Sequence, residues 1–264
     1  MAATCGCSVP KTGAAQSPDP PTAQESLTKP VAPPESLTIE TVHSPARDAN
    51  VELITMRPKG VGGRLPVCLA LHGRSNTARM FLDLGVPDLL NEAVSGGVKP
   101  FAVVAVDGGD SYWVARNPQD DPQKMLTEDL PTWLANRGFT APFSAFGISM
   151  GAYGALNYAR TPGLSAVAAI SGALFLNWAD AKSRNAFVDE ARWEATEPLL
   201  HPGDVKSSQL GVWCGASDPF ITANRQLISK ANPKVSAISP GDHSATYWKR
   251  ILPQVISFIG STVP

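Results

Sequence analysis

Three residues of this chain have the types and the order needed to move an acyl group through a covalent intermediate. The first is Ser149, in the pentapeptide Gly147-Ile148-Ser149-Met150-Gly151, where a short apolar run meets a helix-forming segment. A serine hydroxyl becomes a nucleophile when a base removes its proton, and a Gly-x-Ser-x-Gly turn between strand and helix presents that hydroxyl clear of its neighbours. We predict that Ser149 is the nucleophile; the alternative is a glycine-rich turn without chemistry.

The base should be His243. In the α/β-hydrolase order of serine, acid and histidine, the histidine comes last. His43, beside an expected hairpin, and His72 both precede Ser149, and His201 lies in a Pro/Gly break. Only His243 follows the last expected strand, in a loop before the last expected helix. The alternative for His243 is a solvent-exposed neighbour of a helix cap.

The acid that orients this histidine is predicted to be Asp218. It follows directly on the apolar run 210–214, so it should project from the same sheet edge as Ser149. Asp242 adjoins His243 and is expected to face solvent or a helix cap. The remaining acidic residues between the serine and the histidine are Asp180, Asp189, Glu190, Glu194, Glu197 and Asp204.

Two backbone N–H groups are expected to bind the oxyanion that forms when the acyl carbon becomes tetrahedral. One belongs to Met150, directly after the nucleophile, and the other to Arg74, in the loop after an earlier strand. Gly73 lets the backbone of that loop approach closely. The side chains of His72 and Arg74 are expected to be structural, for example by pairing with Asp107.

The elements that must position these groups alternate between strands and helices. An antiparallel hairpin is expected from Leu37 to Thr41 and from Val51 to Met56, followed by continuously apolar strands that should be buried on both faces. These are Val67–Leu71, Ala102–Val106, Phe143–Ile148, Ala166–Ile170, Leu210–Cys214 and Val235–Ile238, with helices at Ala78–Val94, Asp121–Asn136, Met150–Arg160, Thr222–Ala231 and Ala245–Ile259. The pattern predicts an α/β-hydrolase fold, a mostly parallel sheet flanked by helices with an antiparallel N-terminal hairpin.

Composition divides the chain into two parts. Residues 1–35 contain seven prolines and few large apolar side chains, so we expect a disordered tether. Residues 36–264 have the length and apolar content of one catalytic domain. The net charge of −1 gives no argument for nucleic acid, and no apolar run approaches the roughly 20 residues that span a bilayer.

The four cysteines suggest two different roles. The start Met1-Ala2-Ala3-Thr4-Cys5-Gly6-Cys7-Ser8 is similar to a bacterial lipoprotein cleavage region, so Cys7 or Cys5 could receive lipid. We therefore expect export or attachment to the cell envelope; the alternatives are a plain flexible N-terminus and a cytoplasmic protein. Cys68 and Cys214 lie in apolar runs and are expected to be buried and free of disulfides.

An interval of about 35 residues, 174–208, interrupts the alternation of strands and helices. An insertion after a strand end of an α/β sheet often lies above the site, although a surface helix at the edge is the alternative. Tyr112, Trp113 and Trp178 are expected to bind substrate, with Phe187 and Trp193 near them. Aromatic walls suit an acyl chain or a sugar ring; ordinary core filling is the other interpretation.

No metal or organic cofactor is expected. The sequence has no His-Glu-x-x-His, no paired Cys-x-x-Cys and no Gly-x-Gly-x-x-Gly after a strand.

Several motifs together resemble the putative esterase family, which includes esterase D (S-formylglutathione hydrolase), feruloyl esterases and the antigen 85 mycolyltransferases. The resemblance covers about residues 64–260. The matching segments are Leu71-His72-Gly73, 106–113, 147–154, Ile170-Ser171-Gly172 and 241–248, of which the last looks most like the mycolyltransferase branch. That branch uses Glu where this chain has Asp218.

The resemblance and the residues together predict a serine esterase that hydrolyses carboxylic esters through an acyl-enzyme on Ser149. The first alternative is an acyltransferase that moves the acyl group to a sugar or an alcohol. The second is an interaction protein that keeps the fold without catalysis. The expected partner is a small-molecule, lipid or sugar ester.

Overall fold

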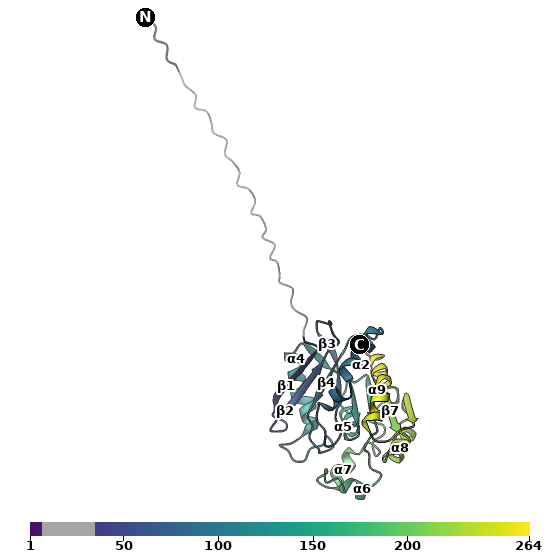
Figure 1. The fold of residues 1–264 in the computed structure, drawn as a ribbon. Coiled ribbons are helices and arrows are strands. Elements are labelled where there is room, and N and C mark those ends of the chain that lie inside the picture. The colour runs from purple at the N-terminus through teal and green to yellow at the C-terminus, as the bar shows by residue number, and fades with distance from the viewer. Residues whose placement is uncertain (7–34) are drawn as a thin grey trace. The chain divides into compact units, whose positions relative to one another are not determined.

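A computed structural model of the chain describes residues 1–6 and 35–264 (Figure 1). The chain divides into two units, Met1–Ala32 and Pro33–Pro264, and all helices and strands of the described residues lie in the second. The predicted tether falls mainly on residues 7–34, outside the described part, and stays a prediction.

An eight-stranded sheet forms the centre of the second unit. Its order is β1-β2-β4-β3-β5-β6-β7-β8; β1 and β2 form an antiparallel hairpin, β2 pairs antiparallel with β4, and all other neighbours are parallel. The predicted fold class is therefore confirmed. The strands are β1 (Leu37–Ser44), β2 (Ala49–Met56), β3 (Leu65–Leu71), β4 (Ala102–Val106), β5 (Phe139–Ile148), β6 (Ala166–Ile170), β7 (Leu210–Gly215) and β8 (Val235–Ser239).

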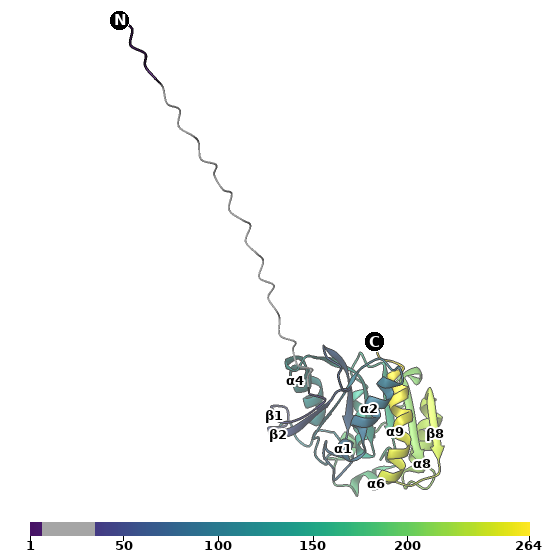
Figure 2. The same cartoon turned by 45° about the horizontal axis from the view of Figure 1, so that its top comes forward.

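Helices cover both faces of this sheet, and each face has its own apolar core. On one face lie α1 (Met80–Asp83), α2 (Val86–Ser95) and α9 (Ala245–Gly260), with α2 and α9 side by side in Figures 1 and 2. The other face is covered by the π-helix η1 (Met125–Asp129), which follows α3 (Pro122–Lys124), and by α4 (Leu130–Asn136), α5 (Met150–Tyr158) and α8 (Ile221–Ala231).

Two predicted elements differ from the structure. The single helix expected from Ala78 to Val94 is two helices, because Gly85 between α1 and α2 adopts a left-handed φ of 79°. The strand β8 is not buried on both faces. As the last strand of the sheet it has only one neighbour, and its residues alternate between half-buried and exposed.

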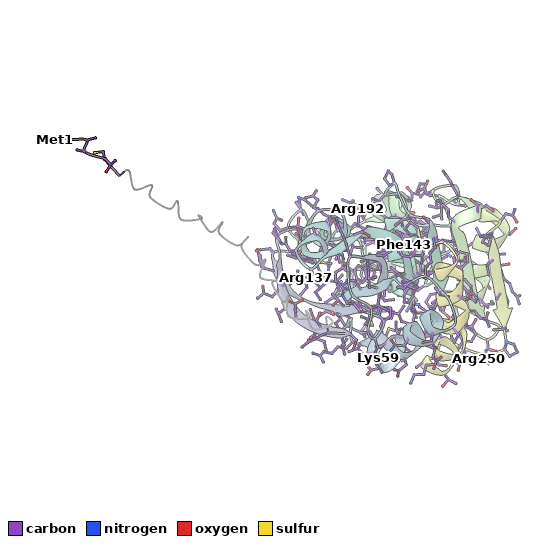
Figure 3. The ribbon with its side chains drawn as sticks, turned by 90° about the horizontal axis from the view of Figure 1, so that it is seen from above. Met1, Lys59, Arg137, Phe143, Arg192 and Arg250 are labelled. Atoms are coloured by element: carbon purple, nitrogen blue, oxygen red, sulfur yellow. The ribbon has the colours of Figure 1, made fainter. Side chains whose placement is uncertain are left out.

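Burial otherwise follows the sequence pattern. Figure 3 shows Lys59, Arg192 and Arg250, which are exposed, and Phe143, which is buried. Cys68 on β3 and Cys214 on β7 are fully buried free thiols, as predicted. Within the described ranges, no helix has both the length and the apolar character to cross a membrane.

Parallel pairing determines where the loops lie. Because β3 to β8 run in one direction, the loops that follow them meet at a single edge of the sheet. The insertion 174–208, which contains α6 (Trp178–Lys182) and α7 (Glu190–Thr196), follows β6 at this edge, and the 3-10 turn Ser207–Gln209 joins its end to β7.

Candidate active site

Ser149 occupies a sharp turn between β5 and α5. Its backbone adopts φ 59° and ψ −118°, a conformation that L-residues rarely adopt. The turn is that tight because a Cβ on Gly147 would collide with the Gly151 carbonyl, and a Cβ on Gly151 would collide with the Leu71 carbonyl. The turn is further held by a 2.9 Å hydrogen bond from the Ser149 N–H to the Ile170 carbonyl. The sequence motif thus places the hydroxyl at the carboxyl end of the strand, where it faces the loops of the sheet edge.

The structure brings Ser149, His243 and Asp218 together from three different loops. His243 Nε2 lies 2.9 Å from Ser149 Oγ, and His243 Nδ1 lies 2.8 Å from Asp218 Oδ2. These loops follow β5, β8 and β7, respectively. His243 is 94 positions from Ser149 in the chain and 25 positions from Asp218. This arrangement can pass a proton from the hydroxyl to an imidazole that a carboxylate orients.

Asp218 is buried, yet its pKa is lowered from the ordinary value. Burial alone would raise the pKa by disfavouring the charged carboxylate. Hydrogen bonds from His243 and from the Phe220 N–H, which lies 2.8 Å from Oδ1, outweigh that effect. The carboxylate is therefore ionised at neutral pH and can hold a proton on Nδ1 of His243.

Two aromatic rings hold the imidazole of His243 in place. Phe220 lies 5.4 Å and Trp248 5.2 Å from the His243 ring, centroid to centroid, and Trp248 meets the imidazole edge to face. Trp248 is itself fixed by a 3.1 Å hydrogen bond from its Nε1–H to Ser171 Oγ. None of these three residues has a role that the sequence alone predicts. In the sequence, Ser171 and Trp248 lie in the family-like segments 170–172 and 241–248, and Phe220 follows the predicted strand 210–214 by six residues.

The loop that contains Arg74 lies against the nucleophile. A Cβ on Gly73 would lie 3.3 Å from the Ile148 carbonyl oxygen and 3.4 Å from Ser149 Cβ, closer than most side chains tolerate. In the described part of the chain, neither the Arg74 N–H nor the Met150 N–H, at the first turn of α5, has a hydrogen-bond acceptor. Both are therefore free to donate to an oxyanion.

His72 fixes the peptide that supplies the Arg74 N–H. Its side chain is fully buried; Nε2 accepts the Gly108 N–H at 2.9 Å, so Nδ1 must hold the proton that is donated to the Gly73 carbonyl at 2.8 Å. Burial lowers the pKa of His72, which keeps this ring neutral. The Asp107 carboxylate, the expected partner, instead accepts the Ala78 N–H.

Tyr112 and Trp113 do not form the expected substrate wall. They are 2% and 0% exposed, so no substrate can reach them in this structure. The Trp113 ring packs over Gly108 and Gly154, and its Nε1–H donates to the His72 carbonyl at 3.2 Å. Their segment folds inward because both residues adopt left-handed φ angles near 60°. We therefore assign both to the core that supports the site.

The insertion contacts the site through aromatic rings that pack at tilted and edge-to-face angles. Phe187 and Phe175 pack with Tyr112, and Phe175 lies 6.3 Å from Phe220, the ring against His243. Trp178, the third expected substrate residue, is half-buried and lies 6.1 Å from the buried Trp193.

Glu197 anchors this insertion from inside. Its buried carboxylate accepts the Phe175 N–H at 3.2 Å, the Trp193 Nε1–H at 3.0 Å and the Leu199 N–H at 3.2 Å. Burial raises the pKa of Glu197 to about 7, against the effect of these hydrogen bonds. From the sequence, Glu197 is only one of the candidate acids between Ser149 and His243.

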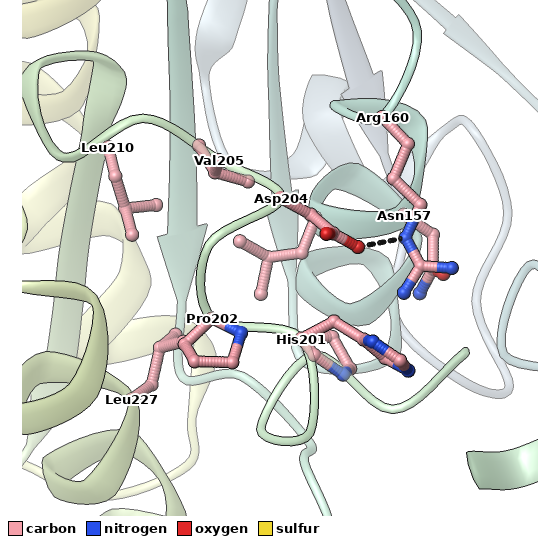
Figure 4. A pocket seen from close by; sticks show the side chains of 10 residues that line it. Asn157, Arg160, His201, Pro202, Asp204, Val205, Leu210 and Leu227 are labelled. Carbon is pink, nitrogen blue, oxygen red and sulfur yellow. Dashed lines mark ion pairs between the residues drawn. The ribbon is translucent and has the colours of Figure 1, made fainter. Parts of the chain in front are cut away.

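A separate recess lies away from this edge, between α5 and the end of the insertion (Figure 4). It encloses only about 10 Å³, and the ion pair of Arg160 with Asp204, at 2.7 Å, borders it. That volume suits a water molecule rather than a ligand. Among the residues that the structure describes, no group of three His, Cys, Asp or Glu side chains could hold a metal ion.

Solved structures with this fold include several hydrolases. A ferulic acid esterase has a TM-score of 0.70 at 19% identity, over 86% of this chain and 98% of its own. An S-formylglutathione hydrolase from Staphylococcus aureus has a TM-score of 0.68 at 16% identity, over 86% and 100%. The MPT51 protein of Mycobacterium tuberculosis has a TM-score of 0.67 at 19% identity, over 86% and 99%. At these identities the likeness shows the fold.

At the level of sequence, no curated protein matches the chain. Residues 44–259, however, match the family described as putative esterase. The chain belongs to that family. As a member of the putative esterase family it is an α/β-hydrolase by fold and a carboxylic ester hydrolase by class. The resemblance that the motifs suggested is thereby confirmed, and the matched range includes Ser149, Asp218 and His243.

Proposed function

We propose that this esterase works through an acyl-enzyme on Ser149. His243 Nε2 takes the hydroxyl proton while Ser149 Oγ forms a bond to the ester carbonyl carbon. The carbon–oxygen bond to the alcohol then breaks, and the alcohol leaves with the proton from His243. His243 then deprotonates a water molecule, which attacks the acyl carbon; the bond from that carbon to Ser149 Oγ breaks, His243 returns the proton to Oγ, and the carboxylic acid leaves.

The observation that supports this proposal most strongly is the continuous set of contacts from Asp218 through His243 to Ser149, at 2.8 and 2.9 Å. Those distances are within hydrogen-bond reach for a base and its nucleophile. The buried, ionised Asp218 stabilises the imidazolium that forms when His243 accepts the proton.

In this proposal the Arg74 and Met150 N–H groups bind the oxyanion of the tetrahedral intermediate. Support comes from the loop of Gly73, which lies directly against Ser149, and from the position of Met150 at the start of α5. A removed oxyanion donor typically costs about 3 kcal/mol in barrier.

Turnover of 4-nitrophenyl butyrate tests the proposal. Ser149→Ala should lower kcat/KM by roughly 10³-fold or more, and the matched control Ser229→Ala, on the exposed side of α8, should retain it. Equal rates for Ser149→Ala and the unchanged protein would contradict the proposal.

Product analysis with added glucose or glycerol separates hydrolysis from transfer, since a transferase yields the new ester in place of the acid.

We also propose that the protein is exported and attached to a membrane through lipid on Cys7 or Cys5. The support is the sequence of residues 4–8; Cys5 is exposed and free, and Cys7 lies outside the described residues. Expression in a bacterial host behind a lipoprotein signal peptide, with radiolabelled palmitate, should label the chain. Loss of the label in Cys5→Ser or in Cys7→Ser identifies the cysteine that carries the lipid. Absence of label on the unchanged chain would contradict attachment.

A further inference from the structure

We propose that a pocket beside His243 binds a carboxylate of the substrate, so that the enzyme prefers esters with an anionic substituent. The pocket lies between the insertion 174–208 and the first turn of α8, and Arg184 supplies its positive charge. This inference rests on the proposed function, because it concerns which esters reach Ser149.

The first observation is an unpaired guanidinium. Arg184 Nε is buried without a hydrogen-bond partner, and among the described residues the side chain of Arg184 makes no ion pair. Its guanidinium lies 5.4 Å from the centre of the Phe220 ring and 5.9 Å from that of Phe175. Cation–π contacts hold the group in position, but they leave its N–H donors for another acceptor. A carboxylate is the acceptor that the planar guanidinium fits best.

The second observation is the location of the pocket. Phe220, which lines it, packs 5.4 Å from the His243 ring, and Leu174, on the other wall, directly follows Ala173, whose N–H bonds the Ser149 carbonyl at 3.1 Å. Buried hydrogen bonds between Gly172 and the Asn224 side chain, at 2.8 and 3.1 Å, join these walls. The pocket and His243 therefore share the Phe220 ring, which places a bound group near the reacting centre.

The chemistry of the lining favours an anion with an apolar stem. Thr222 and Ala223 line the pocket from the first turn of the 11-residue helix α8, where free N–H groups and the helix dipole favour negative charge. Leu174, Leu176 and Phe220 supply apolar surface.

One lining group is acidic. The carboxylate of Asp180 accepts a 2.9 Å hydrogen bond from Asn177 Nδ2 at the start of α6 and is exposed to solvent, so its charge is screened.

The volume of the pocket limits the size of the group that it can bind. Its volume of about 190 Å³ is smaller than the roughly 300–1,000 Å³ of sites that enclose a whole ligand. It therefore suits one short, carboxylate-bearing arm of a substrate whose ester group extends to Ser149.

Two pairs of matched esters test this preference. 4-Nitrophenyl hydrogen glutarate against 4-nitrophenyl pentanoate places the charge on the acyl side, and 3-carboxyphenyl acetate against phenyl acetate places it on the alcohol side. In one pair kcat/KM should be about tenfold higher for the anionic ester, mainly through KM. Ratios near one in both pairs would overturn the proposal.

Variants tie the preference to Arg184. Arg184→Gln should lower the anionic-to-neutral ratio about tenfold, whereas Lys182→Gln, an exposed cation outside the pocket, should keep it. Leu176→Asp, at a residue that is 46% exposed, should also lower the ratio, because the new carboxylate repels the anionic ester. This variant provides the test if Arg184→Gln does not fold. An unchanged ratio in a folded Arg184→Gln or in Leu176→Asp would overturn the proposal.

Failure of the proposed function is distinguishable from failure of this inference. Should no ester be turned over, the esterase mechanism fails, and calorimetric titration with monomethyl glutarate then decides the pocket alone. Binding about tenfold weaker to Arg184→Gln than to the unchanged protein supports the carboxylate site. Equal binding, or no binding to either, overturns it.

Discussion

His243 Nδ1 lies 2.8 Å from Oδ2 of Asp218, a carboxylate that is 1% exposed and whose pKa is lowered. The contact joins the loop after β8 to the loop after β7. Because the carboxylate accepts at Nδ1, the neutral ring must keep its proton there and leave Nε2 free to act as a base toward Ser149.

Asp218→Asn should therefore lower kcat by about 10³ to 10⁴-fold, because an amide can stabilise the wrong tautomer of His243. Asp242→Asn is the matched control: this exposed neighbour of His243 accepts from Ser244 Oγ, and its change should alter kcat less than about twofold. Steady-state kinetics on 4-nitrophenyl butyrate measure both. A larger loss of kcat in Asp242→Asn than in Asp218→Asn would show that Asp242, and not Asp218, orients His243.

His72→Gln should lower kcat about tenfold or more with little change in KM. The substitution weakens the bond from Nδ1 to the Gly73 carbonyl, so the Arg74 N–H is no longer held toward the oxyanion. His43→Gln, at an exposed histidine on β1, controls for loss of an imidazole. An effect on KM alone would contradict the positioning role of His72.

Trp113→Ala should destabilise the fold by about 3–5 kcal/mol, as large-to-small changes in a core do. The residue is 0% exposed and packs against Gly108 and Gly154. Urea unfolding measures the loss, and Trp113→Phe should cost less. Were the variant as stable as the unchanged protein but altered in its acyl chain-length profile, Trp113 would line the substrate pocket after all.

The pKa of Glu197, raised to about 7 by burial, predicts a pH-dependent stability. Between the ordinary value near 4.5 and 7 the folded chain holds a proton that the unfolded chain has lost. The free energy of unfolding should thus fall by up to about 3 kcal/mol as pH rises through this window. Glu197→Gln should lack this component. Parallel stability curves for both proteins between pH 4.5 and 8 would contradict it.

The sequence predicted most of the sheet and the positions of Ser149, Asp218 and His243, for a physical reason. Apolar runs mark strands buried on both faces, and in a parallel sheet the residues directly after such strands must meet at one edge. Gly147 and Gly151 added the constraint of a tight turn.

Side-chain direction could not be read in the same way. Tyr112 and Trp113 follow a strand as Ser149 and Asp218 do, but their left-handed backbone turns them into the core. The Glu197 carboxylate owes one of its hydrogen bonds to Phe175, 22 residues away, and the Arg184 guanidinium packs on Phe220 of another loop; no local pattern encodes these two contacts.

Reaction with a fluorophosphonate tests most directly whether Ser149 is the nucleophile. Intact-mass and peptide analysis should find one phosphonyl group per chain, on Ser149. Asp218→Asn should react much more slowly, because the histidine no longer activates the hydroxyl. An unlabelled chain, or a label that persists in Ser149→Ala, would contradict the account.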